Sequence, residues 1–514
     1  MSKKIDKILL FAVITISIFG LIMIYSASSI WAEYKFNDSF RYVKYQGIFL
    51  IVSTIIMLII SKIDYKIYYE KSNKILLICL ILLILVLIPG IGSIRNGSRS
   101  WFGIGSLGIQ PSEFAKLGLI IFTSKYLSNS NNKIKSFKEG LLPILLVTLL
   151  FFGLIMLQPD LGTGVILVMA IISLLFIAGI NMKFFILGGL TGIIGVIILI
   201  LIAPYRMDRI TSFIDPWKDP LGTGFQIIQS LYAIGPGGLL GNGYLNSIQK
   251  HFYLPEPQTD FIFSIIAEEF GVMGAIIVVG LFLIILYRGI KISTNTKDLF
   301  SKYLSFGILF QLMFQTLMNL MVVIGLIPVT GVTLPFLSYG GSSLLISMIS
   351  MGILLNISRH ASWNKNKCLI WYIWQGRRVK YMNQIVKHDK IENLIYEIRD
   401  MQVMMAKDVA KLYNTETRII NQIVKRNLNR FPKTFCFQLT KEEYQSLKSQ
   451  IVISNDELPG KNTRGGIRHL PYVFTEHGIM MLSSLLKGDF AAEINVQIIN
   501  AFVTMKKYIS TGLL

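Results

Sequence analysis

Long apolar runs separated by short polar segments dominate the first 360 residues of the chain. A helix needs about 20 apolar residues to cross the hydrocarbon core of a bilayer. The first run is of spanning length and lacks a clear cleavage site, so we expect a membrane helix there and not a removable signal peptide. By this measure the pattern predicts ten membrane-spanning helices: residues 8–30, 45–61, 75–92, 113–127, 141–157, 163–181, 184–203, 261–287, 303–325 and 340–357.

The positions of lysine and arginine predict how these helices are oriented, because cytoplasmic loops carry an excess of basic residues. With the N-terminus inside, the inner segments hold the basic clusters: Lys3, Lys4, Lys7, Lys62, Lys66, Lys71, Lys74, Lys133, Lys135, Lys138, Arg288, Lys291, Lys297 and Lys302. We therefore expect a multi-pass membrane protein with both termini in the cytoplasm. Four segments then face outward: residues 93–112, 158–162, 204–260 and 326–339.

The apolar pattern stops after Asn356. Residues 361–390 mix tryptophans with lysine and arginine, a pattern typical of an interfacial helix or of a linker. From residue 391 onward the sequence predicts a soluble, α-rich domain with strands in 395–405 and 434–439. The expected organisation is thus an all-α polytopic membrane domain over 1–360, a basic and aromatic linker over 361–390, and a soluble α+β domain over 391–514.

Composition agrees with this division. Of the 514 residues, 53% are hydrophobic and 15% are charged, whereas soluble proteins carry about 25% charged residues. The net charge of +21 favours anionic partners such as lipid headgroups, pyrophosphates or nucleic acid. Three widely spaced cysteines argue against a disulfide scaffold or a zinc site, and the absence of glycine-rich phosphate-binding motifs argues against a nucleotide site.

The outer segments carry the candidate chemistry. Glu113 and Lys116 lie one helical turn apart in a predicted span, where ionisable groups are costly and usually face a partner or a cavity. They would pair with each other, or Lys116 would meet a phosphate. Asp160 lies in a tight turn between two spans, where it would either cap the next helix or act in chemistry.

Asp260 stands where the long outer segment enters an apolar helix. Partial desolvation there would raise the pKa of its carboxyl into the range of a general base, although an acid at a helix start is also a common cap. Glu268 lies about 12 Å deeper along the same helix. Glu268 and Glu269 both require compensation inside a membrane by a cation, a water cavity or a shared proton.

Several motifs occur together in one order: QPSEFAK at 110–116, QPDLGTG at 158–164, DPWKDPLGTGFQIIQ at 215–229, LPEPQTDFIF at 254–263 and PFLSYGGSS at 335–343. Over residues 8–360 the chain resembles the SEDS family of shape, elongation, division and sporulation proteins, which includes FtsW, RodA and SpoVE. The resemblance implies a peptidoglycan glycosyltransferase that polymerises lipid II beside a penicillin-binding-protein transpeptidase. It leans weakly toward the division and sporulation branch, and by position Asp260 matches the essential aspartate of the family.

The implied reaction is a direct, inverting displacement in which Asp260 is the base and undecaprenyl pyrophosphate leaves. A divalent cation, Mg or Mn, is compatible with this chemistry, and no organic cofactor is expected. The rival interpretation is a lipid II flippase without chemistry, because intramembrane charges also suit a transport path. The residues expected to bind substrate are Arg99, Glu113, Lys116, Arg206, Arg209 and Glu268.

Residues 391–508 resemble a KilA-N-type phage DNA-binding domain through IYEIR at 395–399, DVAKLY at 408–413, NRFP at 429–432, FQLT at 437–440 and LPYVFTEHG at 470–478. The sequence predicts two short helices, Lys407–Leu412 and Thr417–Leu428, separated by a turn at 413–416. This is helix-turn-helix spacing. The alternatives are a solvated basic helix face, and an accidental fusion whose tail is silent. The predicted DNA-reading residues on the second helix are Arg418, Asn421, Gln422, Lys425 and Arg426.

Overall fold

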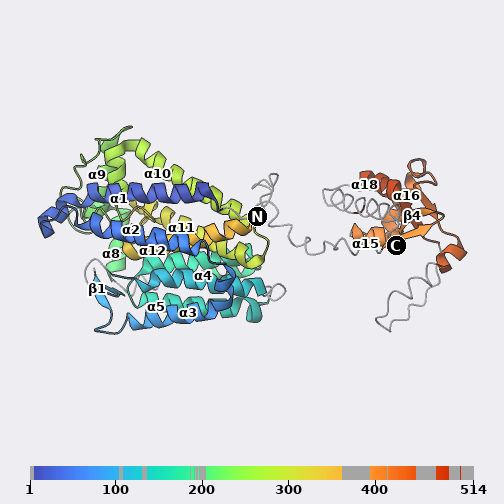
Figure 1. Cartoon of the computed structure of the whole chain (residues 1–514), viewed down its shortest axis with the longest axis horizontal. Helices are drawn as coiled ribbons and strands as arrows, with labels where there is room; N and C mark the ends of the chain where they lie inside the picture. The colour runs from blue at the N-terminus through green and yellow to red at the C-terminus, as the bar shows by residue number, and fades with distance from the viewer. Residues whose placement is uncertain are drawn as a thin grey trace. The chain divides into compact units, whose positions relative to one another are not determined.

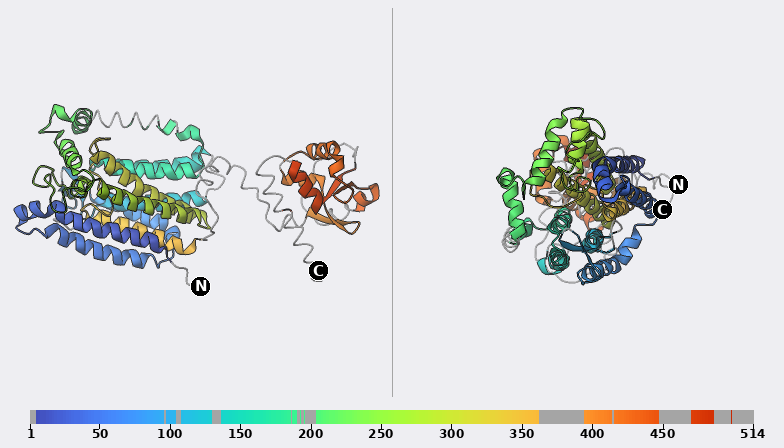
Figure 2. Two further views of the ribbon diagram at one scale, coloured as in Figure 1. Left: turned by 90° about the horizontal axis from the view of Figure 1, so that it is seen from above. Right: turned by 90° about the vertical axis from the view of Figure 1, so that its left-hand side faces the viewer.

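The chain forms two compact units, Met1–Gly376 and Arg377–Leu514, called here the N-terminal and C-terminal units. A computed structural model describes residues 5–95, 97–103, 108–129, 136–185, 187–189, 192, 195, 204–361, 394–413, 415–446, 470–485 and 498. Figure 1 colours these residues along the chain, and Figure 2 gives two further views.

Helices make up most of the N-terminal unit and run side by side, as the end-on view in Figure 2 shows. A hairpin of β1 (Ser93–Arg95) and β2 (Ser98–Trp101) lies between α3 and α4. In chain order the helical elements are α1 (Lys7–Phe36), α2 (Arg41–Ile60), α3 (Lys66–Leu85), α4 (Pro111–Asn129), η3 (Phe137–Leu141), α5 (Leu142–Met156), α6 (Leu161–Ile177), α8 (Pro204–Ile214), η4 (Pro216–Lys218), α9 (Phe225–Ile234), η5 (Gly235–Gly237), α10 (Ile262–Thr294), α11 (Leu299–Val323) and α12 (Gly341–His360).

Six helical stretches among the described residues are long and apolar enough to cross a membrane: Lys7–Phe36, Arg41–Ile60, Phe137–Met156, Ile262–Thr294, Leu299–Val323 and Gly341–His360. α6 is also apolar but has 17 residues. α3 and α4 fall at two further predicted spans and carry charged residues. The predicted class, a helical multi-pass protein with a mixed C-terminal domain, is confirmed.

The bounds of several helices differ from those of the predicted spans. The third span was expected over 75–92, but α3 covers Lys66–Leu85, and the chain then turns at Pro89 and Gly90, where Gly90 has a φ of +89°. The first span was expected to end at residue 30, but α1 continues to Phe36. The predicted span 184–203 falls mainly on residues outside the described part of the chain.

α11 is the central helix of the unit, since it packs against α4, α6 and α10. α12 lies along α2, and Gly352 allows their backbones to approach closely. A Cβ added at Gly352 would stand 2.8 Å from the carbonyl oxygen of Met57. Small residues at such contacts are typical of helix packing in membranes, where association depends on close van der Waals contact.

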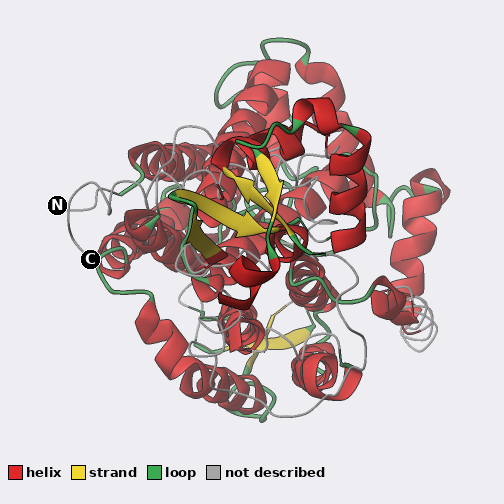
Figure 3. Cartoon of the chain, turned by 90° about the vertical axis from the view of Figure 1, so that its right-hand side faces the viewer, coloured by secondary structure: helices red, strands yellow, loops and turns green. Residues whose placement is uncertain are grey.

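The C-terminal unit combines one antiparallel sheet with short helices (Figure 3). The strand order is β3-β4-β6-β5, so the last strand in sequence is inserted between two earlier ones. The elements are β3 (Ile395–Ile398), β4 (Met401–Met405), α15 (Ala406–Leu412), α16 (Thr417–Arg426), η8 (Leu428–Arg430), β5 (Cys436–Gln438), β6 (Tyr472–Thr475) and α18 (Glu476–Leu485).

The pair α15 and α16 lies where the sequence predicted two helices around a turn, although α16 ends at Arg426 and not at residue 428. Ile420 and Val424 on α16 are buried against Val409 on α15 and Phe474 on β6. Because the buried residues are four positions apart, the opposite face of α16 is left to solvent.

Candidate active site

Residues 328–334, called here the extended segment, have no helix or strand; they belong to the connection between α11 and α12 and form one wall of the site. Its main-chain carbonyls accept hydrogen bonds from side chains of other elements. Gln315 Nε2 donates to the Thr333 carbonyl at 3.0 Å, and Asn319 Nδ2 donates to the Val332 carbonyl at 2.8 Å. Since both amides stand on one face of α11, four residues apart, this helix fixes the course of the segment.

Asp260 lies beside this segment, two residues before the first residue of α10. Asn319 Nδ2 also donates to the Asp260 main-chain carbonyl at 2.7 Å. Gly331 adopts a φ of +72°, and a Cβ added there would stand 3.8 Å from Oδ2 of Asp260. Asp260 is half-buried. Its carboxylate lies close to the glycine-containing backbone of this segment, in the predicted outer part of the protein.

A second carboxylate, that of Asp160, approaches the same segment from the turn between α5 and α6. One of its oxygens accepts from the Thr163 amide at 3.1 Å and so caps α6, and the other accepts from Gln110 Nε2 at 2.9 Å. Gly162 brings this turn against the extended segment, because an added Cβ would lie 2.7 Å from the Thr330 carbonyl oxygen. Of the two roles considered for Asp160, the cap is formed.

The electrostatic environment favours a proton on both carboxylates. Burial and, after it, the neighbouring Glu256 charge raise the pKa of Asp260, Arg209 lowers it, and the resulting pKa is about 6. The charge of Asp160 adds a smaller upward contribution. Burial also raises the pKa of Asp160, against the hydrogen bonds from Thr163. Asp260 thus titrates near the range in which a carboxylate serves as a general base.

Glu113 and Lys116 pair with each other, which was one of the two possibilities left by the sequence. Lys116 Nζ lies 2.9 Å from Glu113 Oε1, and both side chains are buried. The same ammonium donates to Gln315 Oε1 at 3.0 Å. Since Gln315 holds the Thr333 carbonyl, the ion pair supports the extended segment.

The expected cations occupy different places. Arg209 Nη1 donates to the Val329 carbonyl at 2.9 Å, and its charge acts on Asp260. Arg99 lies in β2. The residue before it, Ser98, donates a hydrogen bond from its hydroxyl to the Gln158 carbonyl, in the turn that leads to Asp160. The side chain of Arg206 lies outside the described residues. Among the described side chains, Arg209 is therefore the predicted cation whose charge lowers the pKa of Asp260.

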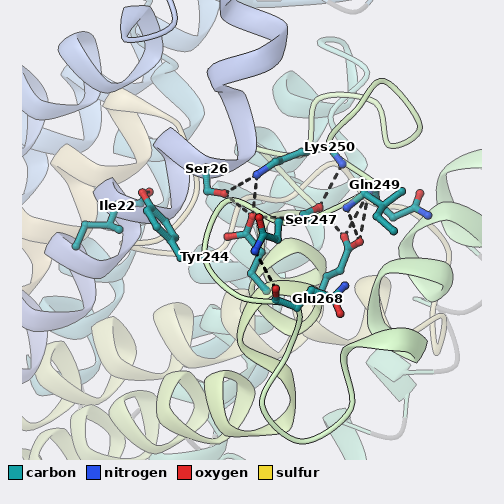
Figure 4. Close-up of polar contacts among 11 residues, drawn as sticks. Ile22, Ser26, Tyr244, Ser247, Gln249, Lys250 and Glu268 are labelled. Atoms are coloured by element: carbon teal, nitrogen blue, oxygen red, sulfur yellow. Dashed lines mark hydrogen bonds and ion pairs between the residues drawn. The ribbon is translucent and has the colours of Figure 1, made fainter.

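Glu268 points toward the outer loop that precedes Asp260 and is held there by loop groups, as Figure 4 shows. The Ile248 amide donates to its carboxylate at 2.7 Å, and the Ser247 hydroxyl donates at 2.5 Å. Glu269 pairs with Lys250 at 3.0 Å. The sequence had indicated that these acids require a cation, a water cavity or a shared proton, but it did not identify Lys250, and it did not point to Gln315 or Asn319.

A divalent cation remains a prediction. Across the described ranges no three His, Cys, Asp or Glu side chains gather where they could hold a metal ion. Asp260 and Asp160 alone would leave most of the oxygen ligands of Mg or Mn to be supplied by substrate phosphates and water.

The predicted DNA-reading helix is α16. The side chains of Arg418, Gln422, Lys425 and Arg426 are exposed, and Asn421 is half-buried. The exposed set is cationic or amide-bearing, as helices that contact phosphates and base edges require.

Comparison with known families gives two separate matches. Residues 6–363 match the cell cycle protein family of FtsW, RodA and SpoVE. Residues 393–485 match the ORF6N domain, which is KilA-N-like and so agrees with the predicted resemblance.

Individual proteins resemble the first part of the chain along nearly their whole lengths. Stage V sporulation protein E of Bacillus subtilis is 50% identical over 364 residues, which is 70% of this chain and 100% of that protein. A probable peptidoglycan glycosyltransferase FtsW of Trichlorobacter lovleyi is 41% identical over 69% of this chain and 93% of its own. The likeness therefore ends before the C-terminal unit.

Solved structures show the same arrangement. A chain in a structure on the coordination of polymerization and crosslinking by a peptidoglycan synthase complex aligns with a TM-score of 0.58 and 30% identity, covering 69% of this chain and 98% of that one. The rod shape determining protein RodA of Thermus thermophilus aligns with a TM-score of 0.53 and 27% identity, over 70% of this chain and 98% of its own.

Proposed function

This chain belongs to the FtsW, RodA and SpoVE family of cell cycle proteins, and from that premise we propose that it polymerises lipid II at the outer face of the cell membrane, with Asp260 as the general base. The chain is a peptidoglycan glycosyltransferase and a multi-pass membrane protein. The observation that supports the role of Asp260 is its half-buried carboxylate, with a pKa raised to about 6, beside a segment fixed by Gln315 and Asn319.

In the proposed reaction two lipid-linked molecules meet in front of the extended segment. The Asp260 carboxylate accepts the proton of the acceptor hydroxyl while the hydroxyl oxygen forms a bond to the anomeric carbon of the donor. The bond from that carbon to the pyrophosphate oxygen breaks, and undecaprenyl pyrophosphate leaves with inversion. A developing anion requires preorganised positive charge, and Arg209, whose charge acts on Asp260, would supply it. Arg99 and Arg206 remain predicted substrate-binding residues of the outer segments.

The fixed position of the Asp260 main chain explains why a single carboxylate can suffice as the base. The main chain of Asp260 is held by Asn319, so the base does not have to be ordered during the reaction. Positioning of this kind removes entropy that a free reactant would lose in the transition state. We also propose that the enzyme works beside a penicillin-binding-protein transpeptidase, in line with the synthase complex among its structural neighbours.

We predict that polymerisation depends on pH through Asp260. Since the base must be ionised and its pKa is raised to about 6, kcat/KM should rise about tenfold per pH unit below 6 and level off above it. The measurement is the initial rate of lipid II polymerisation from pH 4.5 to 8.

Two neighbouring charges give this prediction its controls. The Glu256→Gln variant removes a charge that raises the pKa of Asp260, so its acid limb should move to lower pH. The Arg209→Gln variant removes a charge that lowers that pKa, so its acid limb should move to higher pH. Shifts in the same direction for both variants would contradict the assignment of the limb to Asp260.

We further propose that the C-terminal unit binds double-stranded DNA through α16 on the cytoplasmic side, with both chain termini there. The supporting observations are the exposed basic face of α16 and the ORF6N match. A protein of this kind would hold a DNA segment near the membrane. A silent fused tail is the alternative, and it predicts no specific binding.

The Arg418→Ala variant of the full-length protein should bind duplex DNA roughly tenfold more weakly, because a lost arginine contact costs about 1–3 kcal/mol. The matched control is Lys441→Ala, which removes an exposed cation outside α16. Binding is measured by fluorescence anisotropy of labelled duplex at several salt concentrations. Equal losses in the two variants would show non-specific attraction to a basic protein and contradict the role of α16.

A further inference from the structure

α10 is broken at Gly271, where φ is +61° and ψ is −157°. In an unbroken helix the carbonyls of Glu268 and Glu269 would accept from amides four residues later. Here they accept instead from the amides of Asn242 and Gly243 in the outer loop, both at 2.9 Å. The loop backbone therefore replaces the next turn of the helix as a hydrogen-bonding partner.

The amides beyond the break are paired with the same loop. The Val272 amide donates to the Gly238 carbonyl at 3.0 Å, and the Met273 amide donates to the Leu239 carbonyl at 3.1 Å. These four bonds leave the main-chain groups at the break satisfied, as buried backbone at membrane depth requires. Residues 238–243 thus supply the main-chain hydrogen bonds that α10 lacks at its break.

Glu268 extends the attachment along the loop. Its carboxylate accepts from the Ser247 hydroxyl at 2.5 Å and from the Ile248 and Gln249 amides at 2.7 and 3.4 Å. It is almost fully buried, with 1% exposure. Hydrogen bonds to a carboxylate are about twice as strong as neutral ones, so this side chain holds the loop more firmly than an uncharged group would.

Glu269 connects the loop to a third element. Its Oε1 accepts from Lys250 Nζ at 3.0 Å and from the Ser26 hydroxyl of α1 at 2.5 Å. Lys250 also donates to the Ser26 oxygen at 3.2 Å. Because Lys250 and Glu269 are buried, each compensates a charge that would otherwise be costly to enclose.

The attached loop continues directly to Asp260. The Leu254 amide donates to the Gln249 carbonyl at 2.9 Å, and the Tyr339 amide donates to the Gln258 carbonyl at 2.8 Å. The chain then re-enters α10 at Ile262, six positions before Glu268. Asp260 therefore lies in a loop that is attached to α10 at both ends. Residues 238–243 bond to α10 around Gly271, and the loop enters α10 at Ile262.

We propose that Lys250, Glu268 and Glu269, termed the outer latch, are positioning residues that keep Asp260 in its reactive place. The proposal rests on the proposed function of Asp260. The outer latch does not touch the reacting atoms. It limits the movement of residues 243–260 so that the base faces the extended segment in nearly every molecule.

Loosening the outer latch should lower kcat more than it changes KM. If Asp260 is in place in only a fraction of the molecules, kcat falls to that fraction of its full value, while substrate contacts elsewhere remain. For Lys250→Met, which leaves Glu269 without its cation, we expect kcat to fall about tenfold and KM to change less than twofold. Glu268→Gln should act in the same direction, because the neutral side chain keeps one acceptor in place of two.

The matched control is Arg288→Met. Arg288 Nη2 pairs with Asp6 Oδ2 at 2.5 Å, and the Asp6 side chain is fully buried, at the predicted cytoplasmic end of the helices. This variant also removes the cation of a buried pair, but it does not contact the outer loop. It should lower thermal stability and leave kcat per folded molecule unchanged.

The experiment combines lipid II polymerisation kinetics with hydrogen–deuterium exchange of the full-length protein in detergent. Lys250→Met and Glu268→Gln should speed exchange in residues 242–258, and Arg288→Met should not. Unchanged exchange there, or equal losses of kcat in Lys250→Met and Arg288→Met, would overturn the proposal. A wild-type protein that forms no polymer contradicts the proposed function instead, and the exchange comparison still decides whether the outer latch holds the loop.

Discussion

Asp260→Asn should polymerise lipid II at least about a hundredfold more slowly than the wild type. The substitution keeps the size of the side chain but removes the group that accepts the proton, and general-base catalysis typically contributes about 10²–10⁴-fold in rate. Because Asn319 holds the main chain of residue 260 and not its carboxylate, the fold should be retained. The rate is measured as glycan polymer formed by purified protein, with the melting temperature recorded alongside.

Asp219→Asn is the matched control for this variant. Asp219 is an exposed carboxylate in the same outer segment, where it accepts from the Thr223 amide at 2.8 Å. Its loss should leave the rate within about twofold, since exposed substitutions away from special features have small effects. Full activity in Asp260→Asn, or equal losses in both variants, would show that Asp260 is not the base.

Lys116→Met should reduce the stability of the protein by about 3–5 kcal/mol, the usual cost of removing one partner from a buried ion pair. Lys116 is 1% exposed, and its removal leaves the Glu113 carboxylate buried without its cation. It also removes the hydrogen bond to Gln315, which orders the wall beside Asp260. We therefore expect a lower melting temperature, a lower folded yield and weak polymerisation.

Lys125→Met on the same helix is the control for this second prediction. Lys125 is half-buried, with its ammonium 5.2 Å from the ring centre of Tyr69, and a contact of this kind is worth about 0.5–1 kcal/mol at exposed sites. The double variant Glu113→Gln with Lys116→Met should recover much of the stability, because no unpaired charge stays buried. A Lys116→Met protein as stable as Lys125→Met would contradict the structural role of the ion pair.

Hydropathy predicted the spans well where one apolar helix fills one run of sequence, as in α11 and α12. It failed at the third span because residues 86–92 are apolar but contain Pro89 and Gly90, which turn the chain toward the β1–β2 hairpin. The helix gains at its N-terminal end what it lacks at its C-terminal end, because α3 begins at Lys66 and not at residue 75. The mean hydropathy of a sequence window does not reveal such a shift of the helix along the chain.

At the site, the sequence identified Asp260 by its position where the outer segment enters an apolar helix and by the family resemblance. Neither of these requires knowledge of the spatial neighbours of Asp260. Gln315 and Asn319 were missed because an amide inside a span looks the same whether it holds a carbonyl or faces another helix. Lys250 was missed because nothing near it in the long outer segment indicates a partner. Its partner, Glu269, is 19 positions away, and their pairing depends on the break at Gly271.

The C-terminal unit shows the same limit. The two helices of the helix-turn-helix follow from local sequence, and they were predicted nearly to the residue. β6 was not predicted, because its place between β4 and β5 depends on pairing with Val403 and Cys436, which lie far from it in the chain. Local pattern cannot specify such long-range registers.

The most direct test of the account is polymerisation of lipid II by the purified wild-type protein in detergent. Without a sealed membrane there is nothing to transport across, so a flippase without chemistry gives no product. We predict glycan polymer and released undecaprenyl pyrophosphate from the wild-type protein, alone or with a penicillin-binding-protein transpeptidase added. Unchanged lipid II under both conditions would contradict the assignment of this chain as a glycosyltransferase.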